Sequence, residues 1–142
     1  MYLGPAVDAD IPGAAAILDE HGWGHEDSQL GERFVARDDV SVLGSLRLID
    51  TPEGVYVADV IVHPDRRGRG IGSDLMRAAM RTRSGPFFLV CHPERLAFYQ
   101  RLGFDATDRS TWPTPVVEVS KAEDDWDSSH EHLHHYLLCE RS

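Results

Sequence analysis

The stretch HPDRRGRGIGSDLM, from His63 to Met76, places three arginines and three glycines in one turn ahead of a periodic apolar run. Glycine loses more conformational freedom on folding than any other residue, and neighbouring arginines repel each other. The residues before the turn, VYVADVIV at 55–62, are mostly β-branched and predict a strand. Apolar residues after it recur at helical spacing: Leu75, Met76, Ala79 and Met80. The stretch therefore predicts a joint between a strand and a helix over 73–83.

Such a joint is suited to bind an anion. The first turn of a helix has backbone N–H groups without helical partners, and the helix dipole is positive there. Glycines remove side chains that would block an approaching anion, and arginines add positive charge, so phosphate oxygens fit this turn. The alternative is a tight glycine turn whose arginines are simply solvated.

The composition limits what else the chain can be. Its 142 residues are 42% hydrophobic and 27% charged, which predicts one globular domain over residues 1–142. The net charge of -10 argues against nucleic acid as a partner, and no apolar run has the roughly 20 residues of a membrane helix. No secretory signal is visible at the N-terminus, so Cys91 and Cys139 are expected to be free thiols and the protein cytoplasmic.

Two common phosphate-binding motifs do not fit the turn. A P-loop needs Gly-Lys-Ser/Thr, whereas Ile71-Gly72-Ser73 stands here. Gly68, Gly70 and Gly72 are spaced G-x-G-x-G, which is not the G-x-G-x-x-G of a dinucleotide site. A nucleotide triphosphate or a nicotinamide dinucleotide is therefore not the expected ligand.

Strand and helix signals alternate along the rest of the chain. A helix is expected over 10–19, with Asp10 as its cap and Pro12 in its first turn, and another over 93–102, ended by Gly103. The residues over 108–133, rich in Pro, Ser, Asp and Trp, are expected to be irregular. Strands are expected at 2–7, 33–37, 41–49, 55–62, 86–90, 104–107 and 134–140.

Two motifs give the chain a family resemblance. Arg67-x-x-Gly70-x-Gly72, after a strand that ends at Val62, resembles the acetyl-CoA motif of the GNAT superfamily of N-acetyltransferases. AFYQRLGF, from Ala97 to Phe104, is similar to a second signature of that family. The order of the expected elements also matches over nearly the whole chain. The resemblance implies an α/β fold, a mixed central sheet of about seven strands flanked by helices, and acetyl-CoA as co-substrate.

The resemblance also implies the roles of particular residues. The backbone of the turn would bind the pyrophosphate of coenzyme A, with Arg67 and Arg69 adding charge. The strand before it would hold the acetyl group through Val60 and Val62, with the Val62 N–H as donor to the thioester carbonyl. The residues implied in pyrophosphate binding are Arg67, Gly68, Arg69, Gly70, Ile71, Gly72 and Ser73.

The same family resemblance implies a general acid within the second motif. Tyr99 matches the tyrosine that lies near the CoA sulfur and can protonate the leaving thiolate, and the alternative is a core aromatic residue. His92 stands where many family members carry Asn, and it could donate a hydrogen bond to CoA or titrate near neutral pH. Cys91 and His92 are adjacent at a strand end, so their side chains point to opposite faces and a covalent acetyl-cysteine route is not expected.

Direct transfer requires removal of a proton from the amine. An alkyl amine with a pKa of about 10.4 costs roughly 4–5 kcal/mol to deprotonate at neutral pH. Asp59, three residues before Val62, is the candidate base or amine anchor, and the alternative is a carboxylate that bonds loop backbone. With the acidic residues of 108–131, it would favour a cationic amine.

Two other clusters leave alternatives open. His130, His132 and His134 alternate and could bind zinc, but a polar strand entry explains them without a metal, and no metal is expected. Trp23, His25, Trp112 and Trp126 could line an aromatic pocket for a cation.

The expected activity is direct acetyl transfer from acetyl-CoA to the primary amine of a small, cationic molecule. Two alternatives remain. One is acetylation of a protein or peptide amine, and the other is an acyl-CoA-binding sensor without catalysis. The sequence leaves open the acceptor, the acyl length and the oligomeric state, including a homodimer.

Overall fold

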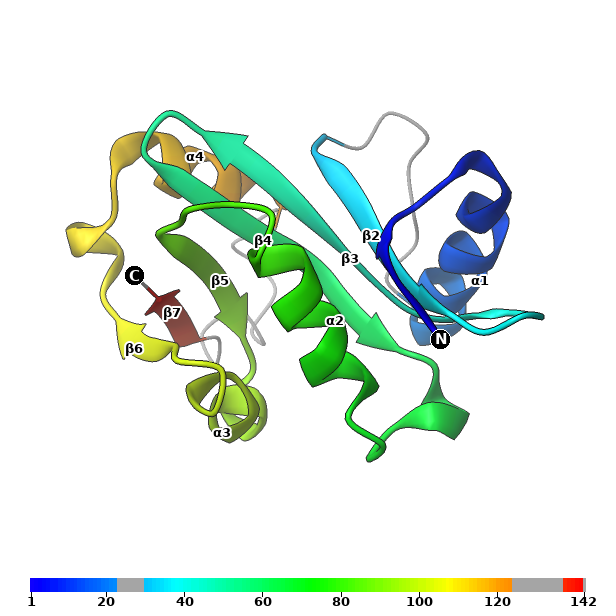
Figure 1. The fold of residues 1–142 in the computed structure, drawn as a ribbon. Coiled ribbons are helices and arrows are strands. Elements are labelled where there is room, and N and C mark those ends of the chain that lie inside the picture. Colours follow the sequence, from blue (N-terminus) through cyan, green and yellow to red (C-terminus); the bar gives the residue numbers. More distant parts are fainter. Residues whose placement is uncertain (23–29, 124–136, 142) are drawn as a thin grey trace. The chain divides into compact units, whose positions relative to one another are not determined.

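The computed structural model describes residues 1–22, 30–123 and 137–141 (Figure 1). The elements follow the expected order except for one helix, α4, which was not expected. The elements are β1 (Tyr2–Pro5), α1 (Ile11–His21), β2 (Glu32–Arg37), β3 (Val42–Thr51), β4 (Gly54–Val62), α2 (Ile71–Met80), β5 (Phe87–Cys91), α3 (Leu96–Gln100), β6 (Asp105–Thr107), α4 (Thr114–Glu123) and β7 (Leu137–Arg141).

The described strands form one sheet of seven, in the order β1-β2-β3-β4-β5-β7-β6. β4 and β5 pair in parallel, with Val55 opposite Phe87, while β2 pairs antiparallel with β1 and β3. A parallel pair needs a crossover connection, and the segment with α2 supplies it. The expected α/β class and the mixed sheet of seven strands are therefore confirmed.

Contacts divide the chain into two compact units. The first consists of Met1–Leu48 and Asp59–Arg83, and the second of Ile49–Ala58 and Ser84–Ser142. β3 and β4 each run from one unit into the other, so the hairpin between them is part of the second unit.

In the first unit, helices cover both faces of the sheet. Val35 belongs to the core cluster that α1 forms, together with Ala14, Ile17, Leu18, Val42 and Ile61. The neighbouring residue Phe34 points to the opposite face of the sheet, because side chains alternate along a strand. On that face, the guanidinium of Arg83, which follows α2 in the chain, lies 6.0 Å from the centroid of the Phe34 ring. α2 packs against β1 and β2 and buries its apolar residues, which confirms the amphipathic pattern.

Gly44 allows β3 to approach β4 closely. A Cβ placed on Gly44 would lie 3.2 Å from the carbonyl oxygen of Ile61 and 3.6 Å from a methyl of Leu75 in α2. The first distance is tighter than nearly all real Cβ contacts, so a side chain at this position would push either the strand or the helix. A residue without a side chain therefore fits here.

The second unit has its own core, in which Trp112 is central. Its ring meets that of Phe88 edge-on with centroids 5.1 Å apart, and its indole N–H donates to the Thr107 hydroxyl at 2.8 Å. With Trp112 only 6% exposed, the expected role of this residue in an aromatic acceptor pocket is not supported. The buried cluster comprises Ile49, Tyr56, Ala58, Phe88, Trp112 and Val116.

The expectation of irregular structure over 108–133 is wrong for its first part. A 3-10 turn, Arg109–Thr111, is followed by α4. The helix buries Val116 completely and Ser120 with it, so packing rather than intrinsic propensity holds it. The rest of the expected loop, from residue 124, lies outside the described residues.

Asp10 stands at the start of α1 as expected, but its side chain does not cap that helix. Its carboxylate instead accepts a bond from the Val7 N–H at 2.9 Å and lies 3.0 Å from Nε of Arg37. The buried carboxylate thus joins the segment before α1 to β2.

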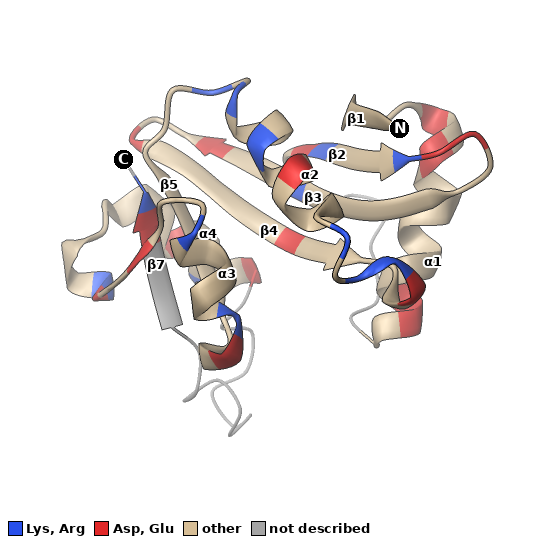
Figure 2. Cartoon of the chain, turned by 60° about the horizontal axis from the view of Figure 1, so that its bottom comes forward, with Lys and Arg blue, Asp and Glu red and all other residues tan. Residues whose placement is uncertain are grey.

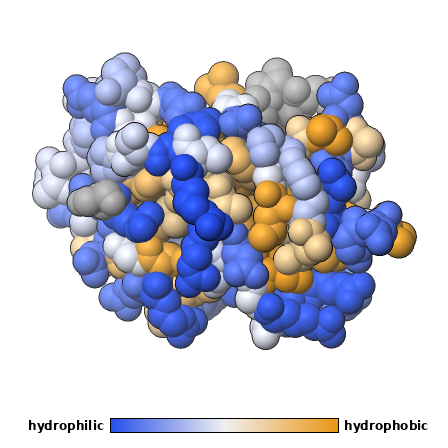
Figure 3. Space-filling view, viewed as in Figure 1, coloured by the Kyte–Doolittle hydropathy of each residue, from blue (hydrophilic) through white to orange (hydrophobic). Residues whose placement is uncertain are grey.

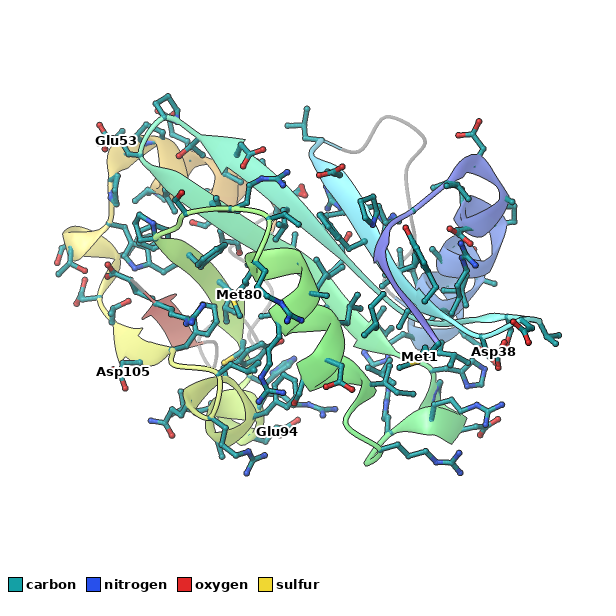
Figure 4. The ribbon with its side chains drawn as sticks, viewed as in Figure 1. Met1, Asp38, Glu53, Met80, Glu94 and Asp105 are labelled. Carbon is teal, nitrogen blue, oxygen red and sulfur yellow. The ribbon has the colours of Figure 1, made fainter. Side chains whose placement is uncertain are left out.

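The loops and the surface of the molecule are largely hydrophilic on the face that Figure 3 shows. At the turn after β2, Oδ1 of Asp38 accepts bonds from the N–H groups of Val40 and Ser41 at 2.8 and 2.7 Å (Figure 4). Hydrophobic residues reach the face shown in Figure 3 as separate patches among hydrophilic ones. Among the described helices, none is both long and apolar enough to cross a membrane.

Candidate functional site

The turn from His63 to Gly70 begins with hydrogen bonds between its own residues. Pro64–Arg66 forms a single 3-10 turn, and Nδ1 of His63 accepts a bond from the Asp65 N–H at 3.2 Å. The chain then extends at Arg67, with φ of -68° and ψ of 153°. The three residues that follow, 68–70, are all exposed to solvent.

Gly68 and Gly70 both adopt a left-handed conformation, each with φ of +79°. A side chain in that conformation costs roughly 1–2 kcal/mol. A Cβ placed on either glycine would meet no atom within 4 Å. The backbone therefore requires glycine for its shape, and the space beside it is open to a ligand.

α2 begins directly after these glycines and lacks a capping side chain. Gly70 is its N-cap residue and makes no side-chain cap bond, while its carbonyl accepts the bond from the Asp74 N–H at 3.0 Å. Arg67 and Arg69 precede this end of the helix in the chain and are exposed, and Figure 2 shows basic residues on the segment between β4 and α2. A helix N-terminus thus follows an open glycine turn that carries two exposed arginines, which is the composition of an oxyanion site.

The turn is joined to the end of β4. Nε of Arg67 donates to the carbonyl oxygen of Val62 at 3.3 Å, and the His63 N–H donates to the carbonyl oxygen of Leu43 in β3 at 2.7 Å. Because successive N–H groups of a strand point to opposite edges, the Val62 N–H points away from β3.

Asp59 lies within β4 in an unusual conformation. Its φ of +57° is the only positive value of a non-glycine residue among those described. Its Oδ2 lies 2.7 Å from Nε of Arg47 and 3.7 Å from Nη2 of Arg33. The alternative considered from the sequence, bonding to loop backbone, is not what these contacts show, because the partners are two guanidinium groups.

The sequence did not single out Arg33 and Arg47 as site residues. They are directly opposite each other in the pairing of β2 with β3. Burial is the largest cause that lowers the pKa of Arg33, and the charge of Asp59 opposes it. Arg47 interrupts an apolar run in β3, which was an available signal, whereas Arg33 is one of three charged residues in β2. The register that makes the two arginines partners is not local information.

In the second unit, Tyr99 lies in α3 and is 8% exposed. Its ring meets those of Phe98 and Phe104 edge-on, with centroids 5.0 and 6.0 Å away. Its carbonyl oxygen accepts hydrogen bonds from the N–H groups of Leu102 and Phe104, and these bonds form the turn that contains Gly103. The ring is thus fixed by packing.

His92 follows β5 and begins the 3-10 turn Pro93–Arg95 without a side-chain cap bond. It is half-buried, whereas its neighbour Cys91 is buried. The helix expected over 93–102 is therefore divided into this turn and the shorter α3.

The expected site residues fall into two groups. The first unit holds Asp59, Val60, Val62 and the segment Arg67–Ser73, while the second holds His92 and Tyr99. No cluster of metal-ligating side chains occurs within residues 1–22, 30–123 and 137–141. The histidines considered as zinc ligands, His130, His132 and His134, lie outside those ranges.

Solved structures with the same fold come from several organisms. N-acetylglutamate synthase from Neisseria gonorrhoeae, complexed with coenzyme A and N-acetyl-glutamate, is 19% identical with a TM-score of 0.76. The match covers 99% of this chain and 34% of that one, so this chain spans only part of that protein. Rv2747 from Mycobacterium tuberculosis, in complex with CoA and NLQ, is 16% identical with a TM-score of 0.70, covering 99% and 98% of the two chains.

A third structure and a family model complete the comparison. Arabidopsis thaliana Naa50, in complex with the bisubstrate analogue CoA-Ac-MVNAL, is 16% identical with a TM-score of 0.69 and covers 99% of this chain and 97% of its own. The curated proteins give no match. The model of the acetyltransferase (GNAT) domain matches residues 29–106, which include the elements from β2 to α3 and the glycine turn. The chain belongs to the GNAT family of acetyltransferases.

Proposed function

We propose that this protein transfers the acetyl group of acetyl-CoA directly to the primary amine of a small molecule. The observation that carries the proposal is the open, left-handed glycine turn at the uncapped start of α2, with Arg67 and Arg69 beside it. Coenzyme A carries a pyrophosphate, and backbone N–H groups over Arg67–Ser73 would bind its oxygens. The similar structures from Neisseria gonorrhoeae and Mycobacterium tuberculosis are complexes with CoA, which supports the same ligand.

The end of β4 would position the acetyl group. The backbone of Val60 and Val62 would lie beside the acetyl group, and the Val62 N–H would donate a hydrogen bond to the thioester carbonyl. Charge develops on that oxygen during attack, so a fixed donor stabilises the transition state more than the ground state. The bond from Arg67 to the Val62 carbonyl supports this role, because it links the phosphate turn to the strand that carries the donor.

The reaction forms one bond and breaks one. The amine nitrogen attacks the carbonyl carbon, a C–N bond forms, and the C–S bond breaks to release the thiolate of CoA. Tyr99 would give its phenolic proton to that sulfur, and His92 would donate a hydrogen bond to CoA. A buried Cys91 supports direct transfer over an acetyl-cysteine intermediate.

The amine must also lose a proton, which costs roughly 4–5 kcal/mol at neutral pH for an ordinary alkyl amine. Asp59 is the candidate for the base or the amine anchor. Its contact with Arg47 weighs against the base, because a proton on Asp59 would remove the negative charge that faces a buried guanidinium. The alternative route for the proton is a chain of water molecules.

A panel of amines tests the proposal. Acetyl-CoA is mixed with the protein and with small amines or a short peptide, and release of free CoA thiol is followed together with the acetylated product. We expect turnover with small amines and micromolar binding of acetyl-CoA by calorimetry. Transfer to the peptide alone would show a peptide acetyltransferase, and binding without any transfer would show a sensor.

A further inference from the structure

β4 changes its backbone conformation at one residue, Asp59. The φ of +57° places Asp59 in the left-handed region, within a strand that runs from Gly54 to Val62. A side chain in that region crowds the following carbonyl oxygen, and a residue in a sparsely populated conformation persists only where its surroundings fix it. Aspartate tolerates the left-handed region better than most residues, but only glycine adopts it without this cost. The structure around Asp59 must therefore hold the conformation.

The side chain of Asp59 is held by two arginines, one from β3 and one from β2. Its Oδ2 accepts a bond from Nε of Arg47 at 2.7 Å and lies 3.7 Å from Nη2 of Arg33. Both arginines are fixed in turn, because Nη1 of Arg47 donates to the carbonyl oxygen of Leu30 at 2.7 Å and Nη1 of Arg33 donates to the hydroxyl of Ser45 at 2.6 Å. The Arg47 side chain is only 4% exposed, so a rotation that withdrew the carboxylate would leave a buried charge without this partner. The arginines thus oppose any conformation of Asp59 that turns its carboxylate away.

The conformation of Asp59 sets the direction of the strand segment that follows it. The N–H of Val60 belongs to the planar peptide group after Asp59, so its direction depends on the torsion angles of Asp59. At the other end of the segment, the His63 N–H donates to the carbonyl oxygen of Leu43 in β3 at 2.7 Å. Residues 60–62 are therefore fixed at both ends, by the side chain of Asp59 and by the backbone of His63.

We propose that Arg47, assisted by Arg33, is a positioning residue, which holds Asp59 in the left-handed conformation and thereby directs the N–H groups of residues 60–62 to where the thioester would lie. The inference rests on the proposed acetyl transfer and deepens it, because it gives the Asp59 carboxylate a role in addition to that of an amine anchor. Neither arginine touches the substrate in this role. A donor displaced by about 1 Å stabilises the charge on the thioester oxygen less well, and such a displacement can cost about a hundredfold in rate. The carboxylate between them also offsets the repulsion of two arginines that stand opposite each other in the sheet.

Glycine and alanine at position 59 separate the backbone conformation from the carboxylate. Both variants lose the charge and any base or anchor, but glycine adopts the left-handed conformation freely, whereas alanine does not. We expect kcat of Asp59→Gly to exceed that of Asp59→Ala by at least about tenfold, both measured on folded protein. Equal kcat in the two variants overturns the proposal, because the conformation at residue 59 would then not matter for transfer.

Arg47→Met tests the residue that holds Asp59. The change keeps the carboxylate but removes its nearest partner, so kcat should fall at least about tenfold, while the Kd of acetyl-CoA stays as in the wild type. Arg47→Lys keeps a charged donor and should lie between. With glycine at position 59, Arg47→Met should change kcat by less than about threefold, because glycine keeps its conformation without the arginine. Equal falls in both backgrounds would show that Arg47 acts by another route and overturn the assignment. The control is Arg37→Met in β2, whose partner is Asp10 and whose kcat should be that of the wild type.

Crystal structures of these variants give a second measurement, which does not depend on transfer. Residue 59 should keep its positive φ in Asp59→Gly and leave the left-handed region in Asp59→Ala and in Arg47→Met. An unchanged φ at residue 59 in Arg47→Met overturns the proposal. Absence of transfer by the wild type would count against the proposed function, whereas the conformation of residue 59 would still decide whether the arginines hold it.

Discussion

Nε of Arg47 donates a 2.7 Å hydrogen bond to the carboxylate of Asp59, a residue that β4 holds in a left-handed conformation. The contact joins β3 to β4 just before the segment that would hold the acetyl group. The Arg47 side chain is 4% exposed and that of Asp59 24%. The ion pair is therefore less exposed to solvent than an ordinary surface ion pair. Its removal should lower the free energy of unfolding and weaken acceptor binding.

Asp59→Asn decides between the roles of this carboxylate. Asparagine tolerates the left-handed conformation and can still accept from Arg47. Loss of the charge should lower the free energy of unfolding by about 1–3 kcal/mol, between the values for exposed and buried pairs. We expect KM for the acceptor to rise and kcat to stay within about threefold. A steep fall in kcat that recovers at high pH, in a stable variant, would instead identify Asp59 as the base.

Gly70→Glu should abolish acetyl-CoA binding, because it places a side chain and a negative charge where the pyrophosphate would lie. Gly22→Glu is a matched control, since Gly22 at the end of α1 has φ of +86° and the same open surroundings. Both variants should lose roughly 1–2 kcal/mol of stability from the left-handed backbone. Calorimetry should show binding only in the control, and unchanged affinity in folded Gly70→Glu would refute the assignment of the turn.

Tyr99→Phe should reduce turnover by roughly ten- to a thousandfold with little change in the Kd of acetyl-CoA. The ring and its edge contacts with Phe98 and Phe104 remain, so only the proton donor is removed. The loss should appear in kcat, because protonation of the thiolate matters only as it leaves. Tyr56→Phe, a second buried tyrosine of the same unit, serves as the control. Turnover near that of the wild type would leave Tyr99 with packing as its role.

Asp38→Ala should destabilise the turn between β2 and β3 in a pH-dependent way. The bonds from the Ser41 and Val40 N–H groups lower the pKa of Asp38 in the folded state. Its contribution is therefore fully present above the pKa of the unfolded chain, about 3.9, and is lost as the pH falls through the lower folded value. The difference in Tm from the wild type should shrink on going from pH 6 to pH 2. A constant difference would show that the ionised carboxylate is not responsible.

The sequence predicts the glycine turn and α2 well because their signals are local. The left-handed positions of Gly68 and Gly70 and the periodic apolar face of the helix depend on residues that are neighbours in the chain. α4 was missed because its segment is rich in Pro, Ser, Asp and Trp, which predicted irregular structure. Its Val116, Val117 and Val119 are also β-branched, a feature that is unfavourable in isolated helices. Burial in the core of the second unit stabilises this helix, and no local pattern reports that burial.

The two arginines that contact Asp59 also could not be predicted from the sequence. Arg47 is 12 positions away, and its approach depends on the register of β3 and on the left-handed backbone at Asp59. A strand pattern indicates which residues share a face, but it does not give the residue opposite. The candidate base was therefore identified without the two guanidinium groups that change its chemistry.

The interleaving of the two units constrains how the chain can fold on the ribosome. The segment Ile49–Ala58 is synthesised before Ser84, yet its core partners Phe88, Trp112 and Val116 all follow that point. At synthesis rates of roughly 5–20 residues per second, its apolar side chains wait several seconds for them. A nascent chain that has not yet reached Val116 therefore leaves Ile49 and Tyr56 without their core partners, so the second unit can complete its core only after that residue has been made.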